Sequence, residues 1–372
     1  MRKISWVTLA ALGMTAALAS ADPVNSYVQT NLTSDLPGVA GKQDTNLVNP
    51  WGIAAGPTTP FWVADNGTGL STIYNGSGSA LSLVVTVPPP AASTDTAAPT
   101  GIVFNGTASF GGSHFIFATE DGTISSWTSG TNAVLQATTP NAVYKGLAIG
   151  SNATGNLLYA ANFASGKIDV FNSSFSPASV PGGFNDPSIP AGFAPFDIKT
   201  IDGQLYVTYA MQDADKHDDV AGPGNGFVDV FDTNGNLVRR LVSGGALNSP
   251  WGLAVAPSSF GAFGGDLLVG NFGDGAIHAF DPATGVLLGQ LHNADGSPLV
   301  NDGLWGLEFG NGVQGLDPNT LYFTAGIPGP DSVEDHGLFG SITATPEPGS
   351  VLLMATGLFS LLLAMRRLRA DS

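Results

Sequence analysis

The sequence predicts an all-β protein, a six-bladed β-propeller closed by an N-terminal strand, with an N-terminal signal peptide and a C-terminal hydrophobic helix. Three observations predict the propeller. A short motif recurs about every 50 residues, brief β-type runs alternate with glycine and proline turns, and the middle of the chain has no helical periodicity. The composition agrees, since 50 of the 372 residues are glycine, 25 are proline and 11% are charged. Cysteine is absent, which excludes disulfides, a cysteine nucleophile and thiolate metal sites.

The repeated motif marks the start of each unit. It reads Pro-Trp-Gly-Ile-Ala at 50–54, returns as Pro-Trp-Gly-Leu-Ala at 250–254, and is partly kept at 304–308. The other three copies are degenerate. A period of this size, made of short strands and turns, is typical of propeller blades. The glycine of the motif, or the aspartate that replaces it in the fourth copy, falls at Gly52, Gly101, Gly146, Asp197, Gly252 and Gly306.

Each unit continues with two further strands. The second strands are expected at 61–64, 115–119, 157–161, 205–209, 267–270 and 321–325. The third strands are expected at 72–74, 123–127, 167–171, 227–231, 276–280 and 340–343. Turn pairs such as Asn75-Gly76 and Asn234-Gly235 then lead into a fourth strand.

One strand stands outside this pattern and predicts how the ring closes. The run from Tyr27 to Leu32 alternates like a strand but has no blade of its own, while the sixth unit ends at Thr343 without a fourth strand. Pairing the two would remove two exposed sheet edges. We therefore expect residues 22–344 to form one closed propeller.

Residues 1–21 have the pattern of a secretory signal peptide. Arg2 and Lys3 precede an apolar run, and Ala19-Ser20-Ala21 supplies small residues for cleavage. A permanent N-terminal anchor is the alternative reading. The apolar run is short for a membrane span, which favours the signal peptide.

Residues 345–372 form a second terminal segment. Pro346-Glu347-Pro348 precedes an apolar stretch at 351–364 and the arginines at 366, 367 and 369. This segment resembles the PEP-CTERM sorting tail of Gram-negative bacteria. The resemblance implies a single transmembrane helix, transient anchoring in the inner membrane, processing by exosortase-type machinery, and a final place at the cell surface or outside the cell. An ordinary membrane anchor is the alternative.

The chain is strongly acidic, with a formal net charge of −17. Because several of its few basic residues lie in the two terminal segments, the part between them is more acidic still. Such a surface repels nucleic acid and anionic lipid and attracts divalent cations or cationic partners. We expect no nucleic-acid partner.

Acidic residues should gather on one face of the propeller, because equivalent loops of superposed blades share a face. The loops before the second strands carry only three acids, so the other face should be nearly neutral. We expect function on the acidic face. The loops after the second strands carry Asp65, Glu120, Asp121, Asp213, Asp215, Asp218, Asp219, Asp274, Asp331, Glu334 and Asp335.

Two of these loops, 211–226 and 327–337, are longer than the others and mix carboxylates with histidine. Such groups suit Ca²⁺ or another divalent cation. A solvated acidic loop without an ion is the alternative. The candidate metal ligands are Asp213, Asp215, Asp218, Asp219, Glu334, Asp335 and His336.

Other motifs carry less chemistry. No Gly-x-Ser-x-Gly nucleophile motif occurs, and the catalytic residues are unknown. His278 alternates with apolar residues, so we expect it to pack in a strand. The tryptophans Trp51, Trp251 and Trp305 hold equivalent places and are expected between blades rather than in a sugar platform.

The first repeat, from Pro50 to Gly67, is similar to NHL-type and gluconolactonase-like propeller repeats. The runs at 216–222, 249–254, 268–275 and 336–340 look more closely like an uncharacterised family of secreted bacterial proteins that often carry the PEP-CTERM tail. The resemblance implies fold and destination and no established activity.

Three functions are compatible with these features. The first is an exported, non-catalytic propeller, expected to be monomeric, that binds an extracellular protein, polysaccharide or divalent cation. The second is a metal-dependent lactonase-like or esterase-like hydrolase, with ligands such as Asp65, Glu120, Asn162 and Asn271 converging on one ion. The third is a structural surface protein that binds calcium.

Overall fold

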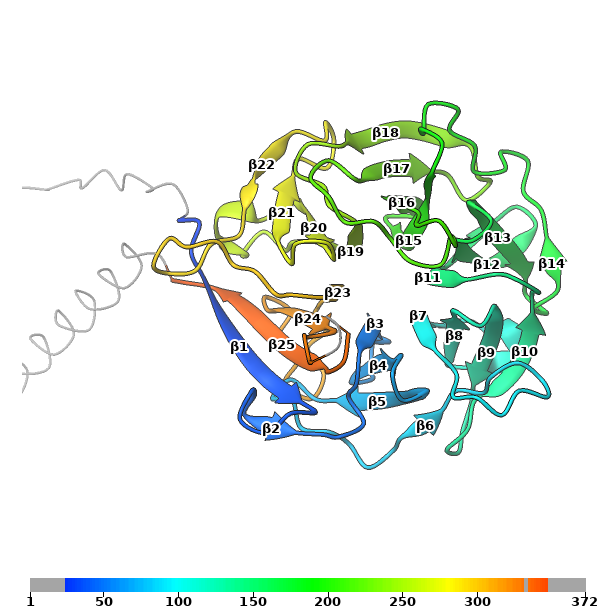
Figure 1. The fold of residues 1–372 in the computed structure, drawn as a ribbon, viewed down its shortest axis with the longest axis horizontal. Helices are drawn as coiled ribbons and strands as arrows, with labels where there is room; N and C mark the ends of the chain where they lie inside the picture. Colours follow the sequence, from blue (N-terminus) through cyan, green and yellow to red (C-terminus); the bar gives the residue numbers. More distant parts are fainter. Residues whose placement is uncertain (1–23, 331–333, 347–372) are drawn as a thin grey trace, which may run out of the picture. The chain divides into compact units, whose positions relative to one another are not determined.

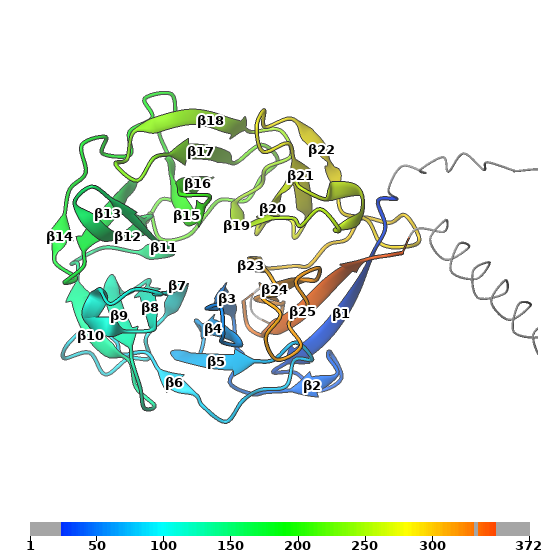
Figure 2. The same cartoon turned by 180° about the vertical axis from the view of Figure 1, so that it is seen from behind.

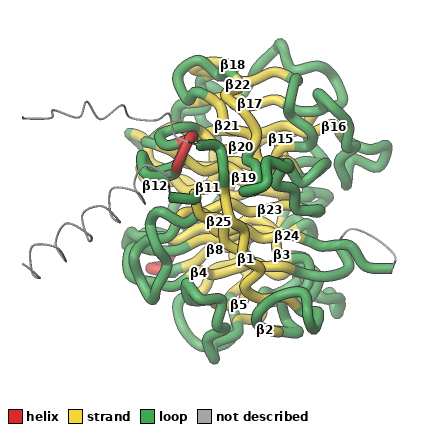
Figure 3. Tube along the Cα trace, turned by 90° about the vertical axis from the view of Figure 1, so that its left-hand side faces the viewer, coloured by secondary structure: helices red, strands yellow, loops and turns green. Residues whose placement is uncertain are grey.

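The computed structural model describes residues 24–330 and 334–346, and these form a ring of six β-sheets around a central axis (Figure 1). The predicted six-bladed propeller is confirmed. Within the described residues the helices are two short 3₁₀ turns, η1 (Phe110–Gly112) and η2 (Gly261–Phe263), which stand out in the side view of Figure 3. A search of those same residues found no helix with the length and apolar character of a membrane span. The segment predicted as a signal peptide, 1–21, and the predicted sorting tail beyond Pro346 lie outside the described residues.

The first five blades are antiparallel sheets whose strands follow the chain outward from the axis. The first three blades are β3 (Pro50–Ala54), β4 (Phe61–Asp65), β5 (Leu70–Tyr74) and β6 (Val85–Thr86); β7 (Pro99–Phe104), β8 (Phe115–Thr119), β9 (Thr123–Trp127) and β10 (Val134–Thr138); and β11 (Tyr144–Asn152), β12 (Gly155–Asn162), β13 (Lys167–Asn172) and β14 (Pro177–Ala178). The next two are β15 (Phe193–Ile201), β16 (Gln204–Met211), β17 (Phe227–Phe231) and β18 (Leu237–Ser243), followed by β19 (Pro250–Val255), β20 (Leu267–Asn271), β21 (Ile277–Phe280) and β22 (Leu287–Gln290).

The sixth blade closes the ring with the N-terminal strand. It contains β23 (Leu304–Phe309), β24 (Leu321–Ala325) and β25 (Leu338–Ala344), and then β1 (Tyr27–Ser34) and the short β2 (Lys42–Gln43). Strands β1 and β25 run antiparallel, with Tyr27 opposite Ala344 and Asn31 opposite Gly340. The predicted closure is confirmed, and both views of the ring place β1 alongside β25 (Figures 1 and 2).

The repeated glycine motif lies in the innermost strands, which surround the axis (Figure 2). A Cβ atom built on Gly252 would lie 2.5 Å from the carbonyl oxygen of Trp305 in the next blade, and one on Gly52 would lie 2.5 Å from that of Thr100. The motif therefore keeps glycine because neighbouring inner strands approach too closely for a side chain. Asp197 holds the equivalent place in the fourth blade.

The core consists of six apolar layers, each shared by two neighbouring blades, and one aromatic cluster near the axis. In the layer between the first two blades, Trp62 stacks on Phe115 with ring centres 4.2 Å apart. Such layers bury most of the apolar surface between sheets, so each blade is stabilised by its neighbours rather than by itself.

Candidate functional site

The residue before each motif glycine lies at the end of the axis where the innermost strands begin. Three of these residues are tryptophan and one is phenylalanine, and all six are buried. Lys145 is the only charged one, and its side chain is 2% exposed. The six are Trp51, Thr100, Lys145, Phe196, Trp251 and Trp305.

Aromatic rings form the floor beneath this end of the axis. Trp51 stacks on Trp305 with ring centres 3.5 Å apart, and Phe272 stacks on the same Trp305 at 4.0 Å. Trp251 meets both indoles edge-on. The tryptophans are therefore packed core residues, as predicted, and do not offer a sugar-stacking surface.

The Lys145 ammonium lies over this floor and is neutralised by carboxylates from two other blades. Its Nζ is 4.9 Å from the centre of the Trp51 ring. It forms an ion pair with Glu120, which follows β8, and a second with Asp218 of the long β16–β17 loop at 3.4 Å. Burial lowers the pKa of Lys145, but Glu120, Asp218 and Glu334 outweigh burial and raise that pKa. Lys145 is therefore charged at neutral pH.

A chain of side-chain amides continues the cluster around the axis. The Trp305 indole N–H donates to Asn49 Oδ1 at 3.2 Å. Asn49 Nδ2 donates to Glu334 Oε1 at 2.9 Å and to Asn66 Oδ1 at 3.3 Å. Asn66 Nδ2 in turn donates to Glu120 Oε2 at 2.9 Å. These contacts tie the first, second and sixth blades to one polar centre, which we call the axial cluster: Asn49, Asn66, Glu120, Lys145, His217, Asp218 and Glu334.

The carboxyl groups of this end differ in their affinity for protons. Burial raises the pKa of Glu334 to about 7, with Glu120 and Asp218 adding to the rise and Asn49 and Lys145 opposing it. Burial also acts to raise the pKa of Asp218, but Lys145 and His217 outweigh it and lower that pKa. Neighbouring Asp219 has a raised pKa, chiefly because of burial. Its buried Oδ2 has no hydrogen-bond partner among the described residues. The cluster therefore holds a proton near neutral pH.

This arrangement limits the chemistry. A charged lysine that is 2% exposed cannot act as a nucleophile or base toward a bound substrate. Glu120 and Asp218 face a single ammonium, and ionisation of Glu334 adds a third negative charge, so the cluster has more negative than positive charge. Donor atoms of Glu120, His217 and Asp218 lie within 4.8 Å of one another, a separation that suits a divalent ion. The Lys145 ammonium, however, already forms ion pairs with two of these groups, Glu120 and Asp218.

Only part of the predicted ligand set joins the cluster. Asp218 and Glu334 do, and Asp219 lies beside it. Asp213 caps its own loop by accepting the His217 backbone N–H at 2.9 Å, while Asp215 is exposed. His336 Nδ1 pairs instead with Asp35 at 2.7 Å, and Asp335 is half-buried in the same loop.

The ligand set predicted for a hydrolase does not converge on one ion. Asp65 accepts the N–H and hydroxyl of Thr72 inside its own blade. Asn162 binds Asp169, and Asn271 binds Asp274 and a backbone carbonyl, also locally. Glu120 alone of the four reaches the axis. The predicted strand position of His278 is confirmed in β21, where it is 9% exposed.

Sequence reasoning missed Lys145, Asn49, Asn66 and His217 as members of the site. A usable signal for Lys145 was present, because lysine replaces an aromatic residue at a repeated position. Asn49 directly precedes the first motif, and its role depends on a carboxylate nearly three hundred residues away. No local pattern could have indicated that contact.

Comparison with known proteins identifies relatives without a described role. No family model matches the chain. Uncharacterised protein R648 of Acanthamoeba polyphaga mimivirus is 34% identical over 337 residues, which is 85% of this chain and 79% of that protein. Uncharacterised protein L690 of the same virus is 34% identical over 323 residues, 82% of each chain. These relatives are viral and give no support to the bacterial origin that the tail resemblance implies.

Solved structures share the fold. A protein of unknown function from Bacteroides thetaiotaomicron superposes with a TM-score of 0.53 at 11% identity, covering 86% of this chain and 76% of that one. Streptogramin B lyase superposes with a TM-score of 0.50 at 11% identity, covering 86% and 98%. At such low identity the likeness establishes the β-propeller and no shared activity.

Proposed function

We propose that the protein is a non-catalytic propeller that binds a cationic partner at the axial cluster. The chain belongs to the family of the uncharacterised mimivirus proteins R648 and L690. The observation that carries this proposal is the charge imbalance at the axis. Glu120, Asp218 and Glu334 come from three blades and surround one ammonium. A lysine or arginine of a partner would supply the missing positive charge.

The cluster is prepared for such a partner on its outer side. The Asp218 side chain is 67% exposed and that of His217 is 49% exposed, while Glu120 and Lys145 below them are enclosed. Lys145 holds the carboxylates in place before binding, so little side-chain freedom is lost when a ligand arrives. The role of Lys145 is thus positioning.

A basic protein segment fits this site better than a polysaccharide. Sugar sites usually offer an exposed aromatic face, and the tryptophans at this end are buried. Among the described residues, the large apolar side chains that are exposed to solvent are valines and leucines. Negative charge without an aromatic platform favours a peptide rich in lysine or arginine.

The test is fluorescence anisotropy with a short lysine-rich peptide and a glutamate-rich peptide as its opposite. We expect the lysine-rich peptide to bind and Asp218→Asn to weaken it by about tenfold. Asp215→Asn removes the same charge from an exposed place in the same loop and should have a much smaller effect. Equal losses in the two variants would mean general attraction to an acidic surface and would refute the assignment to the axial cluster.

The pH dependence gives a second measurement on the same site. Because the pKa of Glu334 is about 7, raising the pH from about 6 to about 8 ionises its carboxyl and adds negative charge. Peptide binding should strengthen over that interval in the wild type and change less in Glu334→Gln. A steeper dependence in the variant than in the wild type would contradict the role of Glu334.

We further propose that the protein is exported by the signal peptide at 1–21 and sorted through the tail at 345–372. Support comes from the charge and apolar pattern of both segments and from the resemblance to PEP-CTERM tails. In this proposal exosortase-type machinery acts near Pro346, Glu347 and Pro348 after transient anchoring in the inner membrane. The propeller would then meet its partner at the cell surface or outside the cell.

A second candidate is a divalent-cation site formed by Glu120, His217 and Asp218, because their donor atoms lie close together. A mixed nitrogen and oxygen set suits Zn²⁺ or Mn²⁺ better than the Ca²⁺ expected from the loops alone. Calorimetric titration of the wild type with each ion should give heat that His217→Ala abolishes.

Lys145→Met provides the sharper variant for this second candidate. Removing the competing ammonium should tighten binding of the ion, since the same carboxylates are then free for it. Exposed His114→Ala is the control for loss of a histidine elsewhere. Absence of heat in both the wild type and Lys145→Met would exclude the metal site.

A further inference from the structure

A cavity lies on the axis, on the side of the aromatic floor opposite the axial cluster. It has a volume of about 280 Å³, and its walls come from the innermost strands of all six blades. Trp251 lines it, and so do residues toward the far ends of the same strands, such as Phe104, Ile149 and Thr200. The cavity therefore extends from the aromatic floor toward the face opposite the axial cluster. We call it the axial channel.

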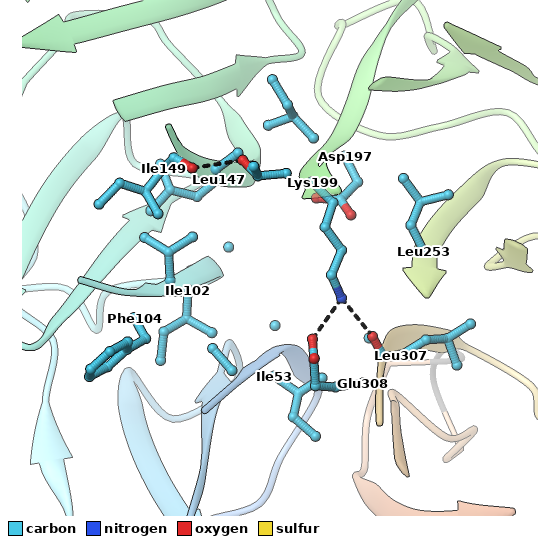
Figure 4. Close-up of a pocket in the computed structure, with 18 of the residues that line it drawn as sticks. Ile53, Ile102, Phe104, Leu147, Ile149, Asp197, Lys199, Leu253, Leu307 and Glu308 are labelled. Carbon is cyan, nitrogen blue, oxygen red and sulfur yellow. Dashed lines mark hydrogen bonds and ion pairs between the residues drawn. The ribbon is translucent and has the colours of Figure 1, made fainter. Parts of the chain in front are cut away.

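The walls of the channel are mainly aliphatic. Ile53, Ile102, Leu147, Leu253 and Leu307 project around it from five blades (Figure 4). One ion pair spans it, in which Lys199 of β15 donates to Glu308 of β23 at 2.7 Å and to the Leu307 carbonyl at 2.9 Å. Both side chains of this pair are about one third exposed, at 29% and 33%. They mark the part of the channel nearest to solvent.

Asp197 places a carboxyl group inside this channel. It replaces the motif glycine of the other five blades and is only 6% exposed. Its Oδ1 lies against Gly146 of the neighbouring inner strand, where a Cβ atom would come within 2.3 Å. The position is therefore accessible to a side chain in the fourth blade because the adjoining blade keeps glycine.

Among the described residues, no lysine, arginine or histidine forms an ion pair with the Asp197 carboxylate. The backbone N–H of Ile198 donates a hydrogen bond to the carboxylate. Lys199 attracts it electrostatically without a hydrogen bond, because the Lys199 ammonium donates to Glu308 and to the Leu307 carbonyl. A buried carboxyl group without its own counter-ion costs free energy unless a ligand supplies the charge. Burial accordingly raises the pKa of Asp197 to about 7.

We propose that the axial channel is a second ligand site, which takes a small organic ammonium ion with a short aliphatic chain. The ammonium would pair with Asp197, the chain would contact the aliphatic walls, and the Lys199–Glu308 pair would lie over the outer end. The volume is near the lower limit of small-molecule pockets, about 300 Å³, so the ligand must be small.

An inorganic cation fits this channel less well. Ca²⁺ takes about six to eight oxygen ligands, whereas the channel offers one buried carboxylate among aliphatic side chains. An alkylammonium ion needs fewer hydrogen-bond acceptors than Ca²⁺. Its alkyl chain also displaces water from the apolar walls of the channel and contacts them directly. Charge and wall chemistry thus favour the same class of ligand.

The experiment is calorimetric titration of the full-length protein at about pH 8 with n-butylammonium chloride, with 1-butanol as the neutral analogue. We expect one ammonium per chain and negligible heat with the alcohol. Asp197→Gly restores the residue of the other five blades, and Asp197→Asn keeps the shape of the side chain. Both should weaken binding by about tenfold or more.

The control is Asp202→Asn, which removes the same charge from an exposed turn of the same blade and should leave binding unchanged. Asp218→Asn should also leave it unchanged, which separates this site from the axial cluster. Failure of the wild type to bind, or binding that survives in a folded Asp197→Gly protein, would overturn the proposal. Competition by CaCl₂ beyond that of an equal ionic strength of NaCl would overturn it in favour of an inorganic ion.

Discussion

Lys145 and Asp197 each break the repeat at a position where most other blades agree. Lysine stands where three blades have tryptophan, and aspartate stands where five have glycine. Both side chains are buried near the axis, one on each side of the aromatic floor. A buried charge lowers stability unless it is compensated. The two proposed binding sites therefore lie where buried charged groups lower the stability of the fold.

Asp197 should make stability fall as pH rises. Burial raises the pKa of Asp197 to about 7 in the folded chain, from an ordinary value of 3.8. Between these values the unfolded chain has lost the proton and the native chain keeps it, so stability decreases from about pH 4 to pH 7 and is low above that range. Urea unfolding should show Asp197→Asn gaining about 2 to 4 kcal/mol on the wild type between pH 4 and pH 8.

The same measurement on Asp202→Asn provides the matched comparison, because that carboxyl group is exposed. Its unfolding free energy should follow the wild type across the range. Parallel curves for Asp197→Asn and the wild type would show that the buried carboxyl carries no such penalty.

At the scale of the element, strand β1 contributes most to the stability of the closed ring. It supplies the outer edge of the sixth blade from the opposite end of the sequence, so the whole ring depends on its pairing with β25. Tyr27 anchors its first residues. The ring is 1% exposed, lies 4.9 Å from Phe260 between ring centres, and donates its hydroxyl to the Phe260 carbonyl at 3.2 Å.

Tyr27→Ala should therefore cost about 3 to 5 kcal/mol of unfolding free energy, because it leaves a cavity and an unpaired carbonyl in the layer beside the fifth blade. Chemical denaturation measures the loss. Val28→Ala, at a neighbouring residue that is 48% exposed, should change stability by less than about 0.5 kcal/mol. Similar values for the two variants would mean that β1 does not hold the ring closed.

The long loops show why an element's composition does not define its chemistry. The loop between β16 and β17 contains four aspartates, yet one caps a turn, one faces solvent, one is half-buried near Ser249, and only Asp218 reaches Lys145. The spacing of residues along a loop does not determine where their side chains point. The backbone angles of each residue determine that direction. Of the four aspartates predicted as ligands in this loop, the structure therefore brings only Asp218 into contact with Lys145.

For the whole molecule, the ring geometry gives one axis with two different ends. The six inner strands all begin at the axial cluster and end toward the mouth of the channel, so a single substitution can affect one end without the other. The acidity of the chain, −17 in all, strengthens attraction of cations to both ends. We expect both proposed interactions to weaken with salt for that reason.

The repeat period, the strand runs and the unpaired strand at Tyr27 determined the six blades and their closure, because a propeller's architecture follows from local patterns repeated along the chain. They also predicted that acidic loops gather on one face. Only the tertiary structure decided which acids meet, since Glu120, Lys145, Asp218 and Glu334 come from four blades and converge only when the ring closes. The axial channel has the same origin, because a cavity is formed by distances between strands that no single stretch of sequence contains.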